Sequence, residues 1–143
     1  VLDGGDGDPD LVAHYAVTRQ SGITIAGTDP KETIGPVPRN MLLTLLTAEL
    51  EWARVHADQR YAVLNACRAE AYAIDGRLVS KLGGAQWWTR QHGPDPVVEE
   101  ALTAQTRGND LGPCTRSAGE FIDGVIQVMS AQDQPTCRAC PGE

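Results

Sequence analysis

The chain has 143 residues, of which 41% are hydrophobic and 22% charged, and its formal net charge is -7. This size and composition are typical of one globular domain that buries a substantial core. The acidic balance argues against nucleic acid and against an anionic membrane surface as partners, since both normally select basic proteins. We therefore expect a soluble, cytoplasmic protein with no membrane span, because the longest nearly apolar run covers only 41–48.

The first 36 residues contain one helix pattern and one short strand pattern. Asp8 and Pro9 suit a helix start, and apolar residues on one face predict a helix over 9–21. The sequence GITIAG then predicts a short strand at 23–26 between glycines. A lone strand needs a partner, so we expect this one to pair with a further domain or a second chain. The proline-rich GPVP at 35–38 predicts a domain boundary.

Beyond this boundary the patterns predict only helices. Capping residues and apolar periodicity indicate five of them, with short connections that favour a helical bundle. The predicted cap or first residues are Pro38, Asp58, Ser80, Asp95 and, in the capping box SAGE, Ser117. The expected fold class is thus mainly α, with a five-helix bundle over 37–130 and a disordered tail at 131–143.

Two cations stand at positions that disfavour a charge. Arg68 shares an apolar helix face with Tyr61, where an unpaired guanidinium would be costly. Lys81 follows the capping Ser80, where the helix dipole repels a cation. A polyphosphate would compensate both residues, since it binds guanidinium, ammonium and the N–H groups of a helix start. Structural alternatives stay open: Arg68 pairs with Glu49 or reaches solvent from a groove, and Lys81 is simply solvated.

Trp52, Asp58 and Tyr61 flank the turn between the first two predicted bundle helices. An aromatic ring beside a carboxylate suits a cationic, sugar-like ligand, through stacking and charge-assisted hydrogen bonds. The alternative is that Asp58 only caps its helix and Trp52 only fills the core. No Ser/His/Asp or Cys/His arrangement for catalysis emerges from the sequence.

The sequence CRAC at 137–140 has the C-x-x-C spacing of a redox or zinc half-site. A structural zinc ion needs four ligands, and neither a second C-x-x-C nor a pair of histidines completes the set. We therefore predict incidental thiols in the tail, with a thiol or zinc role as the alternative.

Taken together, these stretches resemble the aminoglycoside nucleotidyltransferases that adenylate streptomycin and spectinomycin. The similarity covers about residues 8–128, from DPDLVAHYAVTRQSGITIAG through PVPR to DQRYAVLNACRAEAYAIDGRLVSKLGGAQWW, then more weakly PVVEEALTAQ and FIDGVI. In that family an N-terminal nucleotidyltransferase domain precedes an all-helical C-terminal domain, and ATP and drug bind between them. The resemblance implies that 1–36 is the last helix and strand of a truncated α/β nucleotidyltransferase domain, and that 37–130 is the substrate-binding domain.

The same resemblance implies roles for individual residues. Arg68 and Lys81 would contact the phosphates of ATP, while Asp58, Tyr61 and Trp52 would contact the drug. The family's magnesium-binding aspartates and catalytic glutamate belong to the N-terminal domain, and none of them is in this chain.

The implied function is binding of Mg-ATP and an aminoglycoside-like substrate for AMP transfer to a drug hydroxyl, and thus antibiotic resistance, by a chain that is inactive alone. The alternative is a truncated, non-catalytic, stand-alone binding module. Residues 53–57 contain no acid, so the family's additional acidic contact to streptomycin has no match.

Overall fold

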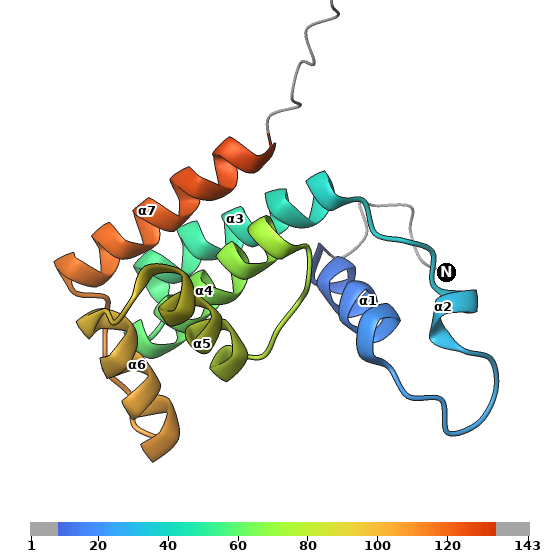
Figure 1. Cartoon of the computed structure of the whole chain (residues 1–143), viewed down its shortest axis with the longest axis horizontal. Helices are drawn as coiled ribbons and strands as arrows, with labels where there is room; N and C mark the ends of the chain where they lie inside the picture. The colour runs from blue at the N-terminus through green and yellow to red at the C-terminus, as the bar shows by residue number, and fades with distance from the viewer. Residues whose placement is uncertain (1–8, 134–143) are drawn as a thin grey trace, which may run out of the picture.

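The computed structural model describes residues 9–133 and consists of helices joined by short loops (Figure 1). A helix of 13 residues and a single helical turn come first, and five helices of 12 to 18 residues follow the proline-rich joint, which confirms the mainly α fold class. None of the helices in 9–133 is long and apolar enough to cross a membrane. The helices are α1 Pro9–Ser21, α2 Pro30–Thr33, α3 Arg39–His56, α4 Gln59–Asp75, α5 Lys81–His92, α6 Pro96–Arg107 and α7 Arg116–Asp133.

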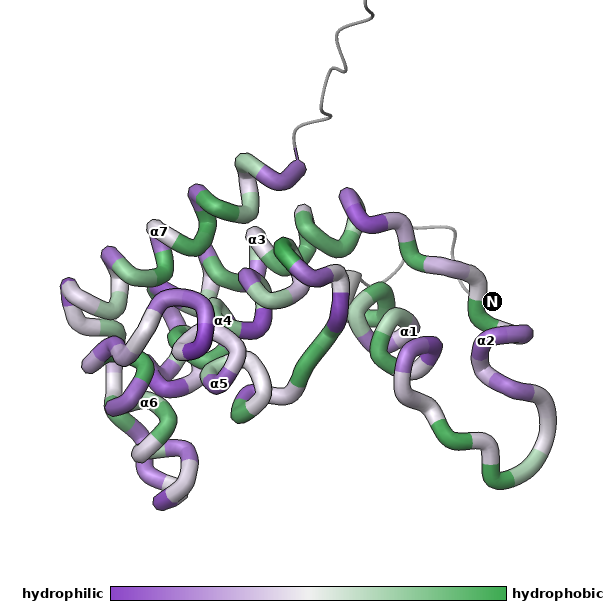
Figure 2. The backbone as a smooth tube through the Cα atoms, in the orientation of Figure 1, coloured by the Kyte–Doolittle hydropathy of each residue, from purple (hydrophilic) through white to green (hydrophobic). Residues whose placement is uncertain are grey.

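Helix α4 is the centre of the bundle and packs against α3, α5, α6 and α7. One group of buried apolar side chains joins α3, α4 and α7, and a second group joins α4 to α5, α6 and α7. Hydrophobic residues recur at intervals along α3, α6 and α7, as expected of helices that bury one face (Figure 2). Residues on α4 are thereby fixed relative to all the helices that surround it.

The helix starts follow the predicted capping chemistry in three places. The side chains of Asp58, Ser80 and Asp95 each accept a hydrogen bond from a backbone N–H in the first turn of α4, α5 and α6. These bonds satisfy N–H groups that have no partner inside the helix. The predicted starts of these three helices are therefore confirmed.

The last helix begins differently from the prediction. Thr115, and not Ser117, caps α7, since its hydroxyl accepts a hydrogen bond from the N–H of Ala118 at 3.3 Å. The N–H of Thr115 itself donates to the side-chain oxygen of Gln59 at 2.8 Å, and this long-range bond sets the helix start. Helix α7 also continues to Asp133, beyond the tail boundary predicted at 131. The rest of that tail, with the CRAC sequence, lies outside the described residues.

The strand predicted at 23–26 is not formed in this chain. Residues 22–29 make an irregular connection between α1 and α2, and the side chains of Ile23 and Ile25 are 88% and 98% exposed. The described part of the chain provides no strand to pair with, and ladder hydrogen bonds need such a neighbour. Pairing of this segment with a second chain or a further domain stays a prediction.

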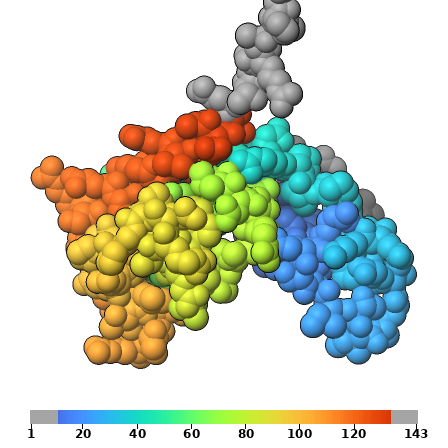
Figure 3. All heavy atoms as spheres, in the orientation of Figure 1, coloured from blue at the N-terminus to red at the C-terminus, as the bar shows by residue number. Residues whose placement is uncertain are grey.

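The α1–α2 segment forms a lobe beside the bundle, with an open notch between the two in the space-filling view (Figure 3). Its anchor to the α4–α5 loop is the side chain of Gln20. The Nε2 group of Gln20 donates to the carbonyl of Leu78 at 2.7 Å, and the N–H of Leu78 donates back to Oε1 at 3.0 Å. This reciprocal pair fixes the loop that leads into α5.

Helix α5 is anchored on α4 by its aromatic residues. The indole N–H of Trp87 donates to Asp75 at 2.6 Å, and that of Trp88 donates to Glu70 at 3.1 Å. The other carboxylate oxygen of Glu70 lies 2.6 Å from Nε2 of His92. Glu70 is only 3% exposed, so these contacts satisfy a carboxylate inside the core. They also fix the second half of α5 relative to α4.

Candidate functional site

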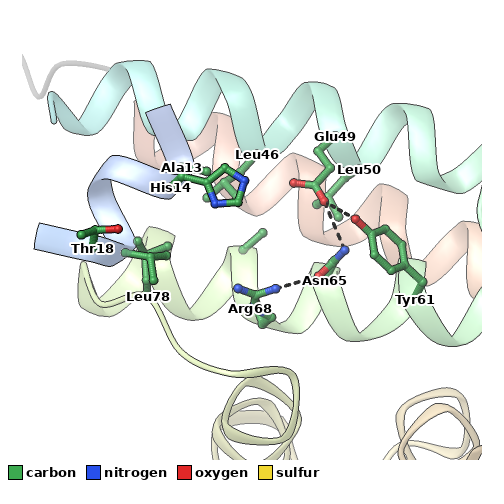
Figure 4. A pocket seen from close by; sticks show the side chains of 12 residues that line it. Ala13, His14, Thr18, Leu46, Glu49, Leu50, Tyr61, Asn65, Arg68 and Leu78 are labelled. Carbon is green, nitrogen blue, oxygen red and sulfur yellow. Dashed lines mark hydrogen bonds between the residues drawn. The ribbon is translucent and has the colours of Figure 1, made fainter. Parts of the chain in front are cut away.

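A cavity of about 390 Å³ lies between α1, α3 and α4 (Figure 4). One part of its wall is apolar and includes Leu46, Leu50 and Leu78. The other part is polar, with side chains from all three helices. The polar residues that line it are His14, Thr18, Glu49, Tyr61, Asn65 and Arg68.

Arg68 is half-buried on α4 and faces this cavity. Its Nε group donates to the carbonyl of Val79 at 2.8 Å, and Nη1 donates to the side-chain oxygen of Asn65 at 3.1 Å. Within residues 9–133 no carboxylate forms an ion pair with Arg68, and the alternative of a salt bridge to Glu49 is not realised. Arg68 thus holds the loop before α5 while its remaining N–H groups stay available.

Asn65 lies between the positive and the negative side chain of the site. Its Nδ2 group donates to Oε1 of Glu49 at 3.2 Å, and the same oxygen accepts a hydrogen bond from the hydroxyl of Tyr61 at 2.8 Å. The orientation of the Asn65 amide follows from chemistry, because a carboxylate only accepts hydrogen bonds and a guanidinium only donates them. Asn65 therefore keeps Arg68 and Glu49 apart while contacting both (Figure 4).

Lys81 is the first residue of α5 and is half-buried; it does not line the cavity itself but contacts Tyr61, which does. Its ammonium lies 4.6 Å from the ring centroid of Tyr61, which is a cation–π contact. Burial lowers the pKa of Lys81, the guanidinium groups of Arg68 and Arg60 lower it further, and Glu49 opposes them. No ion pair to Lys81 occurs in the described part of the chain. An anionic ligand would relieve the repulsion between these cations.

Tyr61 connects Lys81 to Glu49. Burial, followed by the hydrogen bond to Glu49, raises the pKa of the Tyr61 hydroxyl above its usual value. The tyrosine therefore stays neutral, donating to Glu49 with its hydroxyl while its ring face meets Lys81.

Asp58 does not line this cavity. One of its oxygens accepts from the N–H of Arg60 at 2.9 Å, and the other accepts from the N–H groups of Leu111 and Gly112 at 2.8 and 2.7 Å. The predicted capping role is confirmed, and the same carboxylate also fixes the α6–α7 loop against the start of α4.

Trp52 also lies outside the cavity lining. Its side chain is 56% exposed and its ring centroid is 5.5 Å from that of His56, so the alternative that it fills the core is wrong. The structure therefore brings Tyr61, Arg68 and Lys81 together, but not Asp58 or Trp52.

Gly84 is a structural determinant of the site that the sequence analysis missed. A Cβ atom at this position would lie 2.8 Å from Cγ and 2.9 Å from the backbone N of Arg68. Only glycine lets α5 approach α4 this closely at the residue that carries the guanidinium. The signal was present in KLGG, since a glycine inside a helical pattern often marks close backbone approach.

A family model described as "aminoglycoside adenylyltransferase, C-terminal domain" matches residues 32–129 of the chain. The chain belongs to this family. The match covers the five helices of the bundle apart from the end of α7, whereas α1 lies outside it. A comparison with curated proteins finds none that matches.

Membership of the adenylyltransferase C-terminal domain family confirms the resemblance recognised in the sequence. The polar part of the cavity falls mostly within the matched residues, because Glu49, Tyr61, Asn65 and Arg68 all belong to α3 and α4. Only His14 and Thr18 of α1 lie outside the match. The cations and the carboxylate of the site thus lie within the residues that the family model matches.

Proposed function

We propose that this chain is the nucleotide- and acceptor-binding domain of an adenylyltransferase that transfers AMP from Mg-ATP to a hydroxyl of a spectinomycin- or streptomycin-like antibiotic. The observation that carries the proposal is the pair of half-buried cations, Arg68 and Lys81. They have no ion-pair partner within residues 9–133 and both neighbour Tyr61. Such a pair is costly without an anion and favourable with one.

The donor set fits a polyphosphate. Arg68 keeps N–H groups beyond the two bonds it makes to Val79 and Asn65, and an ammonium offers three donors to phosphate oxygens. The same place does not fit a divalent cation, because Glu49 is the only carboxylate among the described residues that line the cavity and two cations lie near it. We therefore assign no magnesium ligand to this chain.

In the proposed reaction, Arg68 and Lys81 would orient the phosphates of ATP and stabilise the charge that develops during phosphoryl transfer. The general base and the metal ligands would come from a nucleotidyltransferase domain. The reaction therefore requires both parts, and this chain contributes binding and positioning. An acceptor hydroxyl would be brought to the donor by the polar part of the cavity.

The phosphate role is tested by titrating the ¹⁵N-labelled chain with Mg-ATP and following its amide resonances into the millimolar range. We expect shifts centred on the start of α5 and on the middle of α4, which Arg68→Ala and Lys81→Met greatly weaken. Arg90→Ala is the matched control, because Arg90 is an exposed cation in the last turn of α5. Equal affinities of the wild type and Arg68→Ala would contradict the proposal.

A further inference from the structure

Among the described residues, the cavity is lined by one carboxylate, that of Glu49, and only one of its two oxygens accepts hydrogen bonds. Both hydrogen bonds that Glu49 accepts, from Tyr61 and from Asn65, end on Oε1. Within the described residues, no hydrogen bond or ion pair engages Oε2. Figure 4 shows this second oxygen on the cavity side, away from Tyr61. Glu49 thus offers a fixed carboxylate oxygen to whatever fills the cavity.

The carboxylate of Asp58, by contrast, already accepts three backbone hydrogen bonds. Its Oδ2 atom already accepts two backbone N–H groups, and Oδ1 accepts the N–H of Arg60 with the Arg60 guanidinium 3.9 Å away. An acceptor ligand at Asp58 would have to share Oδ1 with the N–H of Arg60, because the N–H groups of the α6–α7 loop occupy Oδ2. A ligand at Glu49 displaces nothing.

The geometry points to Glu49 as a residue that binds a protonated amine of the acceptor and so contributes to its charge specificity. This inference rests on the proposed function, since it places the acceptor in the cavity next to the phosphate-binding cations. Asn65 holds Glu49 and Arg68 at opposite ends of its amide, so the cavity has a negative end and a positive end. A cationic acceptor and an anionic donor can therefore bind side by side.

The apolar part of the cavity wall limits the size and charge of the cation that can bind beside Glu49. Leu46, Leu50 and Leu78 form an apolar surface that solvates neither additional charges nor many hydroxyl groups. The cavity of about 390 Å³ therefore suits a compact amine with one apolar face better than a large polyguanidinium compound. Spectinomycin is the appropriate probe, and streptomycin is the comparison.

The test is Glu49→Gln, which keeps an oxygen to accept from Tyr61 and Asn65 but removes the charge. We expect the affinity for spectinomycin to fall about tenfold or more, as for loss of a charge-assisted hydrogen bond. Binding of Mg-ATP should stay equal or become tighter, because a negative charge near Arg68 and Lys81 is gone. Glu51→Gln is the matched control, since Glu51 is an exposed carboxylate on the same helix.

A loss of spectinomycin affinity without a loss of Mg-ATP affinity distinguishes ligand binding by Glu49 from a merely structural role. If Glu49→Gln weakens both ligands equally, Glu49 only supports the fold of the site and the inference is wrong. The inference is also wrong if the variant binds spectinomycin like the wild type, or if the wild-type cavity resonances do not respond to spectinomycin. In each case the proposed function is judged separately, by the loss of Mg-ATP binding in Arg68→Ala.

Discussion

Lys81 links phosphate binding to proton binding. Its pKa is lowered in the free protein because burial and two guanidinium groups disfavour the ammonium form. A bound triphosphate favours that form and raises the pKa again. Between the two pKa values the complex holds a proton that the free protein lacks, so nucleotide affinity should fall as pH rises through the lowered pKa.

We therefore predict proton uptake when Mg-ATP binds at alkaline pH, just below the ordinary lysine range. Calorimetric titrations in two buffers with different ionisation enthalpies should give different apparent binding enthalpies. The difference should disappear at neutral pH, where Lys81 is protonated in both states, and in Lys81→Met at every pH. A buffer-independent enthalpy in the wild type at alkaline pH would mean that no phosphate lies near this ammonium.

At the scale of the helices, the close contact between α4 and α5 at Gly84 determines the positions of Lys81 and Arg68 relative to each other. In Gly84→Ala the new methyl group meets the backbone of Arg68, which cannot move as a flexible side chain would. We predict a loss of about 1–3 kcal/mol in the free energy of unfolding, together with weaker Mg-ATP binding. Chemical denaturation and the Mg-ATP titration measure the two effects.

Gly124→Ala is the control for this prediction. Gly124 lies on the exposed face of α7, and nothing is within 4 Å of a Cβ atom added there. Alanine should stabilise that helix by up to about 1 kcal/mol, since glycine has the poorer helix propensity. If Gly84→Ala were equally stabilising, α5 would have room to move and Gly84 would not determine the geometry of the site.

The elements also show what sequence can predict. Helix starts at Asp58, Ser80 and Asp95 were found because a cap and its partner lie within three residues of each other. At the start of α7 the SAGE pattern favoured Ser117, whereas the folded chain has its cap at Thr115, whose N–H is bonded to Gln59, 56 residues away. The strand expected at 23–26 is not formed within the described residues for a related reason, since a strand needs a neighbouring strand to pair with.

The residues of the candidate site also divide into those that a local sequence pattern indicates and those that depend on distant parts of the chain. Arg68 and Lys81 stood out because a charge on an apolar face, or at the positive end of a helix, is unfavourable on local grounds alone. Asn65 gave no such signal, because its bridging role exists only once α3 packs on α4. The carboxylate of Asp58 was assigned to a ligand from its aromatic neighbours and from the resemblance, whereas the folded chain also gives it the N–H groups of a distant loop.

At the scale of the whole molecule, the bundle and the α1–α2 lobe differ in how deeply they are packed. Twelve residues of α4 are buried, whereas residues 11–34 contain no buried side chain. Hydrogen exchange should therefore be slow in α4, where it requires global unfolding, and fast in α1, where local opening suffices. The cavity wall that α1 supplies is thus the part of the site that opens most easily.

This difference predicts a coupling between ligand and lobe. The loop before α5 is held on one side by Arg68 through Val79 and on the other by Gln20 through Leu78. A ligand that fixes Arg68 should also fix this loop, so Mg-ATP should slow hydrogen exchange in α1 as well as at the start of α5. In Gln20→Ala, Mg-ATP should no longer slow hydrogen exchange in α1 but should still slow it at the start of α5. Equal slowing of α1 in both proteins would show that the ligand contacts the lobe directly, without this loop.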